Sequence, residues 1–258
     1  MPSEHPWRLD EISLADLRDA GPIEVAVLPL GATEPHNLHL PYGTDTLQVR
    51  AVGDLACARA HRAGARVVLL PAIPYGTETN LAAFPLAMNL NPSTIAAVVA
   101  DLVATLARAG VRKVVLLNGH GGNDLKWIQR EQFGRSGVHL FVCHWYKMAS
   151  DLHPSIFEEP GDHAGELETS MGLAHFPHLV DLSKADAGTR AVPRFEALAK
   201  AWVEITRPWE LLTTNSGAGD PRPASASKGH ALTEAVVARL SSFLIELSGS
   251  PVDERFPY

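Results

Sequence analysis

Short apolar runs alternate with longer segments of helical periodicity through the first half of the chain. The apolar runs predict buried strands at residues 25–30, 66–71, 113–117 and 138–143. The segments between them predict helices at residues 45–63, 91–110 and 123–133. The strands are continuous apolar runs rather than alternating ones, which is typical of strands buried on both faces. The pattern therefore predicts an α/β protein whose mostly parallel sheet is covered on both faces by helices.

The two ends of the chain are less regular. A short helix is expected at residues 14–20, and further helices at 164–173, 196–205 and 228–247. Residues 213–227 are rich in Gly, Ser, Pro and Thr, which predicts an ordered loop or a flap. The chain shows no tandem repeat and no linker, so residues 1–258 are expected to form a single domain.

Composition narrows the class of protein without identifying a chemistry. Hydrophobic residues make up 46% of the 258 residues, enough for a sizeable core. The net charge of -7 argues against a nucleic-acid partner, because phosphate binding needs a basic face. No apolar run is long enough to span a bilayer, and the first residues, Met-Pro-Ser-Glu-His-Pro-Trp-Arg, include no apolar stretch, so a secretion signal is not expected. The two cysteines form no C-x-x-C pair, so a cytoplasmic protein is expected.

Side chains that bind metals are concentrated directly after the first predicted strand. Glu34, His36, His39 and Asp45 lie close together in the sequence, and such a cluster is costly unless a cation holds it. Glu34 and His36 share a face because they are two residues apart, and one carboxylate can bridge two ions. The alternative is that the carboxylates begin a helix and the histidines are polar loop residues. His39 is an odd number of residues from His36, so its side chain is expected to point to the other face of the segment. A supporting role behind the ligands, or a packing role, is expected for His39.

A second cluster, residues 118–123, follows the third predicted strand and reads Asn-Gly-His-Gly-Gly-Asn. Its glycines permit a sharp turn and the close approach of a ligand, so His120 is well placed to bind a metal. The alternative is a phosphate-binding loop, but the spacing matches neither G-x-G-x-x-G nor the Walker pattern. Both clusters follow strands of one parallel sheet, so they are expected to converge at its carboxyl edge.

A third cluster contains Asp162, His163, Glu166 and Glu168. The two glutamates diverge on a helix because they are two residues apart, so one of them is expected to face a site. Asp162 is either a site residue or a helix cap. His163 is free to carry protons near neutral pH or to hydrogen-bond a substrate.

Together, the three clusters resemble the creatininase (creatinine amidohydrolase) family over roughly residues 22–235. The matching strings are Gly-Ala-Thr-Glu-Pro-His at 31–36, His-Leu-Pro at 39–41, Thr-Asp at 44–45, Asn-Gly-His-Gly-Gly-Asn at 118–123 and His-Ala-Gly-Glu-Leu-Glu-Thr at 163–169. The resemblance implies a three-layer α/β/α sandwich. It also implies a dinuclear metal-dependent hydrolase that is usually assembled as a hexamer.

The resemblance implies two divalent ions per subunit, for which zinc, manganese and iron are the candidates. The ligands carried over from the family are Glu34 and His120 for one ion, His36 for the other and Asp45 as the bridge. Creatininase proper has a glutamate where this chain has Gly122, so a fifth ligand is expected elsewhere, with Glu168 as the candidate. Phe-Pro-Leu-Ala at 84–87 replaces the Phe-Pro-Gly-Thr common in the family, which points away from creatinine as the substrate.

The expected reaction is hydrolysis of a small, cyclic amide or formamide C–N bond by a hydroxide that the two ions activate. His163 or Glu168 would move the proton to the leaving group. A rival within enzymes is ring opening of a keto-cyclitol at the same two-metal site. A rival from another class is a non-catalytic α/β module that binds a nucleotide or a sugar phosphate.

The substrate is expected to be a small molecule bound by residues outside the metal ligands. Trp145 and Tyr146 follow the fourth predicted strand and are candidate walls for a flat substrate, with core packing as the alternative. Glu78 and Asn80 are expected to touch substrate from the edge of a loop. The only expected protein partner is a further copy of the chain, in a homo-oligomer, by family resemblance.

Overall fold

In the computed structural model, which describes residues 3–258, four parallel strands form one sheet in the order β2-β1-β3-β4. The strands are β1 (Val25–Leu30), β2 (Val67–Leu69), β3 (Lys113–Asn118) and β4 (His139–His144). β1 and β3 are paired along their whole length, from Val25 opposite Lys113 to Leu30 opposite Asn118. The carboxyl ends of these two strands therefore lie at the same level.

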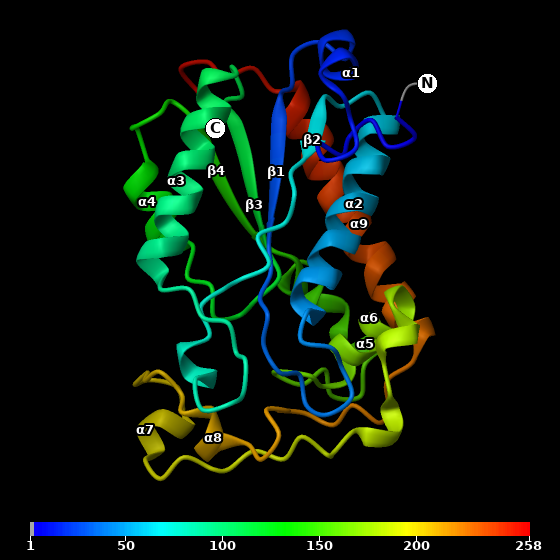
Figure 1. The fold of residues 1–258 in the computed structure, drawn as a ribbon, viewed down its shortest axis with the longest axis vertical. Coiled ribbons are helices and arrows are strands. Elements are labelled where there is room, and N and C mark those ends of the chain that lie inside the picture. The colour runs from blue at the N-terminus through cyan, green and yellow to red at the C-terminus, as the bar shows by residue number, and fades with distance from the viewer. Residues whose placement is uncertain (1–2) are drawn as a thin grey trace.

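Helices cover both faces of the sheet (Figure 1). One face carries α2 (Thr44–Arg62) and α9 (Ala226–Gly249) with α6 (Glu166–His175) packed beside them, and the other carries α3 (Pro92–Arg108) and α4 (Lys126–Gln132). Neighbouring residues of one strand enter different cores: Val25 belongs to the core beneath α2 and α9, and Ala26 to the core beneath α3. The predicted α/β fold is confirmed, with three layers.

Short helices fill the connections and the first part of the chain. The α-helices are α1 (Leu14–Asp19), α5 (His153–Ile156), α7 (Glu196–Ala199) and α8 (Trp209–Leu212). The 3-10 helices are η1 (Thr79–Leu81), η2 (Trp145–Lys147), η3 (Ser150–Leu152), η4 (Pro177–Leu179) and η5 (Leu182–Lys184). Among residues 3–258, none of the helices combines the length and apolar character that crossing a membrane requires.

The ends of the long helices follow local backbone chemistry. α2 ends before Gly64, which has a φ of 87°, a left-handed conformation that favours glycine. α3 begins with Pro92 in its first turn, where a missing N–H costs nothing. α9 begins after Ser225, whose Oγ accepts a bond from the N–H of Lys228.

Two predicted helices are shorter than expected. The helix predicted at 196–205 ends at Ala199, because Trp202 and Ile205 remain 69% and 61% exposed and no apolar surface covers them. The helix predicted from residue 123 starts at Lys126, because the side chain of Asn123 binds Thr77 and neighbouring loops instead.

Candidate metal centre

The candidate centre forms where the loops after β1 and β3 leave the sheet. The chain goes from β1 to β2 on one side and from β3 to β4 on the other, so the two loops diverge at a switch point of the sheet order. The close approach of these loops requires a glycine at position 119. A Cβ added to Gly119 would lie 2.9 Å from the backbone oxygen of Asp45 in the first turn of α2.

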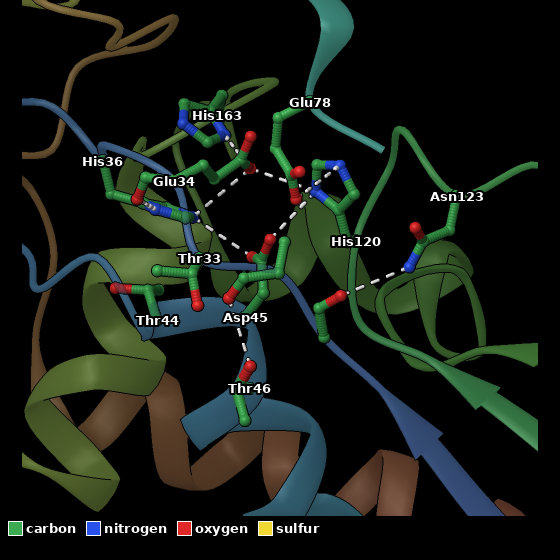
Figure 2. Close-up of polar contacts among 12 residues, drawn as sticks. Thr33, Glu34, His36, Thr44, Asp45, Thr46, Glu78, His120, Asn123 and His163 are labelled. Atoms are coloured by element: carbon green, nitrogen blue, oxygen red, sulfur yellow. Dashed lines mark hydrogen bonds and ion pairs between the residues drawn. The ribbon is translucent and has the colours of Figure 1, made fainter. Parts of the chain in front are cut away.

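Two carboxylates and two imidazoles meet there (Figure 2). Asp45 Oδ1 lies 3.1 Å from His36 Nε2, and Asp45 Oδ2 lies 2.9 Å from His120 Nδ1. Glu34 Oε1 lies 3.0 Å from the same nitrogen of His120. All four side chains are buried. The carboxylate of Asp45 therefore faces a different histidine with each of its oxygens.

Backbone carbonyls orient both imidazoles. His36 Nδ1 donates to the carbonyl oxygen of Glu34 at 3.0 Å, and His120 Nε2 donates to that of Thr77 at 3.1 Å. A carbonyl oxygen only accepts, so these two nitrogens carry hydrogen and the opposite nitrogens are directed at Asp45. This is how proteins prepare a histidine to bind a metal.

Among residues 3–258, ligand atoms suitable for a metal form three groups: the first is Glu34, His36 and His163, and the other two share Asp45. One group is Glu34, Asp45 and His120, and another is His36, Asp45 and Glu168. Within each group the ligand atoms lie within 4.8 Å of one another. Glu34 Oε2 is buried without a hydrogen-bond partner among the described residues. Mixed carboxylate and imidazole donors suit zinc, manganese or iron, so the residues fit the predicted pair of ions.

Of the two glutamates at the start of α6, only Glu168 is directed at this centre. Glu168 Oε2 lies 3.8 Å from His36 Nε2 and accepts the N–H of Ala164 at 2.6 Å. Glu166 is fully buried elsewhere, where it pairs with Lys228 and accepts the N–H of Glu158. Of the two glutamates, Glu168 is therefore the one that belongs to a group of candidate metal ligands.

His163 lies beside the centre without being held by Asp45. Its Nε2 donates to the carbonyl oxygen of Pro35 at 2.9 Å, and its Nδ1 lies 3.7 Å from Glu34 Oε1. Its ring stacks 4.2 Å from that of His36 and meets the edge of Trp209 at 5.0 Å. Nδ1 is therefore the nitrogen of His163 that is free to exchange a proton.

The acids and bases of the centre shift one another's pKa values. Burial alone would lower the pKa of His36, but Asp45 and the nearby glutamates outweigh it and raise that pKa to about 10. Burial opposes ionisation of Asp45, yet His36 and His120 hold its pKa well below the usual range. Burial raises the pKa of Glu168. The carboxylates thus pair with protonated imidazoles, and a metal ion would displace those protons.

A cavity of about 450 Å³ opens onto the centre. The ligand candidates Glu34, Asp45, His120 and Glu168 line it together with His163. The remaining walls include Asn80, Tyr146, His153, Asp162, Arg207 and Trp209. This volume suits a small-molecule substrate.

Only two of the four residues predicted to bind substrate line the cavity. Asn80 and Tyr146 line the cavity, whereas Trp145 is 1% exposed and packs in the core beneath α2 and α9. Glu78 is 0% exposed and also lies outside the cavity wall. His39 Nε2 bonds Thr169 at 2.8 Å, and burial lowers its pKa to about 4, so His39 supports α6 as a neutral side chain.

Three cavity residues gave no signal in the sequence. Trp209, Arg207 and His153 belong to no motif, and each lies far along the chain from the first two clusters. Arg207 lies 5.1 Å from the ring of Trp209 and pairs with Asp162 at 2.5 Å. The packing of α8 against η1 brings this segment to the cavity, and such a long-range contact leaves no local pattern.

Comparison of the sequence with known proteins identifies a family and several relatives. The family model for creatininase, described as creatinine amidohydrolase, matches residues 10–244. The chain is 29% identical over 244 residues to creatinine amidohydrolase of Pseudomonas putida, covering 86% of this chain and 89% of that protein. It is 28% identical over 218 residues to mycofactocin precursor peptide peptidase of Mycobacterium tuberculosis (strain CDC 1551 / Oshkosh), covering 82% and 80%. It is 25% identical over 165 residues to 3-dehydro-scyllo-inosose hydrolase of Thermotoga maritima, covering 61% and 52%.

Solved structures agree with the sequence comparisons. A Bacteroides fragilis protein, provisionally named a creatinine amidohydrolase, superposes with a TM-score of 0.91 at 31% identity, covering 97% of this chain and 100% of that one. A creatininase structure named for manganese has a TM-score of 0.77 at 25% identity, with 95% and 99% covered. A variant creatininase described as Zn-Zn type has a TM-score of 0.76 at 25% identity, with 94% and 98% covered.

Proposed function

We propose that this chain, which belongs to the creatininase family and is a metal-dependent hydrolase, cleaves a C–N bond of a small amide with the help of two divalent ions. The ligands we propose are Glu34, His36, Asp45, His120 and Glu168. The observation that carries the proposal is the position of Asp45, each of whose oxygens faces a different imidazole. One carboxylate shared in this way is the common bridge of a two-metal hydrolytic site.

Two divalent ions, when bound, polarise a substrate carbonyl and make water a better nucleophile at neutral pH. The protein contributes the orientation of the ligands. The backbone carbonyls that accept from His36 and His120 keep each ring in one tautomer, with the opposite nitrogen directed at Asp45. The site is therefore organised before substrate arrives.

His163 is the proposed proton carrier. His163 lines the cavity, and its Nε2 is fixed on the carbonyl oxygen of Pro35. Nδ1 can accept a proton as water attacks and return it to the leaving nitrogen. Glu168 is the alternative carrier, and its Oε2 accepts the N–H of Ala164.

The substrate class follows from the cavity and from the relatives. The cavity of about 450 Å³ has polar walls at Asn80 and an aromatic wall at Tyr146 and Trp209. Relatives named for an amide and for a peptide substrate favour a C–N bond. The Thermotoga maritima relative, named for an inosose, keeps a keto-cyclitol as the second candidate.

Metal removal and replacement test this function. The purified protein is stripped with a chelator, reloaded with zinc or manganese, and assayed with cyclic amides, formamides, short peptides and a keto-cyclitol. We expect turnover of at least one C–N substrate only after reloading, with two ions bound per chain. Turnover that survives complete metal loss would overturn the proposal, and turnover of the keto-cyclitol alone would select the second candidate.

Self-association is a further part of the proposal. The segment between η5 and α9 leaves large apolar side chains exposed, among them Val192 at 86%, Phe195 at 63%, Trp202 at 69% and Leu211 at 73%. Apolar side chains gathered on one segment are typical of a surface covered by another protein. We expect a homo-oligomer, a hexamer by family resemblance, and light scattering coupled to gel filtration measures it.

A cytoplasmic location also remains a prediction. Cys57 and Cys143 are both free thiols, which is consistent with a reducing compartment. Fractionation of the native host with an antibody against the chain would test the location directly.

A further inference from the structure

Beside the metal centre lies a buried carboxylate that accepts no hydrogen bond from the described residues. Glu78 is 0% exposed, and neither of its carboxylate oxygens has a hydrogen-bond partner among residues 3–258. Its Oε1 lies 3.8 Å from His120 Nε2, and Figure 2 shows the two side chains beside each other. A buried carboxylate costs free energy unless a charge compensates it, so the position of Glu78 calls for a functional explanation.

The loop around Glu78 is anchored on both sides. The N–H of Thr77 donates to Asn123 Oδ1 at 3.1 Å, and the N–H of Glu78 donates to Asn89 Oδ1 at 2.9 Å. A Cβ added to Gly76 would lie 2.9 Å from Glu78 Oε1, so the backbone packs closely against the carboxylate. The carboxylate is therefore held beside His120 by its surroundings.

His120 stands between this loop and the proposed ion. Its Nε2 donates to the carbonyl oxygen of Thr77, while its Nδ1 faces Glu34 and Asp45. A Cβ at position 122 would collide with both the Thr77 oxygen and the imidazole, so glycine is required there for the ring to meet the loop. Three features thus converge on the far nitrogen of His120: a carbonyl, a carboxylate and a glycine.

We propose that Glu78 is a positioning residue of the metal centre. From the side away from the ion, its carboxylate faces Nε2 of His120 and keeps Nδ1 turned toward the ion. It also supplies a fourth carboxylate, beside Glu34, Asp45 and Glu168, against the charge of two divalent ions. This inference rests on the proposed two-metal function. Groups that orient a metal-binding histidine in this way typically contribute about 10- to 100-fold to metal affinity.

The test uses two variants of Glu78 and a matched control. Glu78→Gln keeps the shape and removes the charge, whereas Glu78→Met fills the site with an apolar chain of similar length. Glu210→Gln removes the same charge from an exposed position on α8. Zinc and manganese affinities are measured by chelator competition, thermal stability is measured with and without metal, and the visible spectrum is recorded after cobalt substitution.

We expect both Glu78 variants to bind one ion about 10- to 100-fold more weakly, with a shifted cobalt spectrum. Their metal-free melting temperature should equal or exceed that of the wild type, because an unpaired buried carboxylate is gone. Glu210→Gln should match the wild type in every measurement.

Two results would overturn the inference. Wild-type metal affinity in both variants would show that Glu78 does not act on His120. A metal-free protein that is destabilised or unfolded in both variants would show a structural role instead. If the wild type itself binds a single ion, the two-metal function fails, but the effect of Glu78 on the ion at His120 is still measured.

Discussion

Replacing Asp45 by asparagine should weaken the binding of both proposed ions together. Asp45 is 2% exposed, and its two oxygens contact His36 at 3.1 Å and His120 at 2.9 Å. Asparagine has nearly the same shape but only one acceptor oxygen and no charge. Whichever way the amide turns, one ion would face an NH₂ group, and neither would face a negative charge at position 45.

The size of the effect follows from the burial of the carboxylate. Removing one partner from a buried charge pair costs about 3–5 kcal/mol. Since about 1.4 kcal/mol changes an equilibrium constant tenfold, each ion should dissociate about 100- to 4,000-fold more readily. Glu168→Gln is the matched comparison, because Glu168 belongs to the group of His36 and not to the group of His120. Glu168→Gln should weaken the binding of one ion and leave the affinity for the other near its wild-type value.

The assay is the metal-to-protein ratio after dialysis, combined with zinc competition against a chelator of known affinity. Circular dichroism of the metal-free variants confirms that the compared proteins are folded. If Asp45→Asn loses one ion and retains the other at wild-type affinity, then Asp45 is not a bridge and the reasoning from its two oxygens is refuted.

Three further predictions concern catalysis, backbone packing and pH. His163→Gln should lower kcat about 100- to 10,000-fold while both ions remain bound; loss of an ion would make His163 a ligand instead. Gly119→Ala should cost about 1–3 kcal/mol in urea unfolding, because its Cβ would lie 2.9 Å from a backbone oxygen of α2. Gly121→Ala, with no atom within 4 Å of the added Cβ, is its neutral control. Burial would raise the pKa of Asp54, but bonds from Arg8 and a neighbouring indole lower it. The stability that the Asp54–Arg8 pair contributes should be present above pH 4 and lost as the pH falls through the lowered pKa of Asp54. Asp54→Asn should therefore lower the free energy of unfolding by about 1.5–3 kcal/mol at pH 7 and by little in acid, as measured by urea unfolding.

The sheet was predictable because every residue of β1 and β3 is buried, and all of these residues except Lys113 and Asn118, at the two ends of β3, are apolar, as expected of strands covered on both faces. The meeting of the first two clusters was predictable for a related reason. Parallel strands send their loops to one edge, and the register of Leu30 opposite Asn118 places the two loops at one level.

The choice between Glu166 and Glu168 was not decidable from spacing alone. Two residues that diverge on a helix leave open which one faces the site, and the answer depends on Lys228, a partner on α9. The burial of Glu78 was hidden for the same reason. A charged residue in a polar loop reads as exposed, whereas here the loop folds against His120 and Asn123.

The division between ligands and cavity walls explains how one centre can serve different substrates. The ligands follow paired strands or begin long helices, so the core fixes their positions. The walls at Asn80, Tyr146 and Trp209 come from short helices of three or four residues, which few contacts tie to the sheet. Such segments can change in sequence without disturbing β1 or β3. Three relatives of this chain are named for creatinine, for a peptide and for an inosose. Specificity should therefore follow the walls: Trp209→Ala should change KM and the preferred substrate while the metal content stays constant.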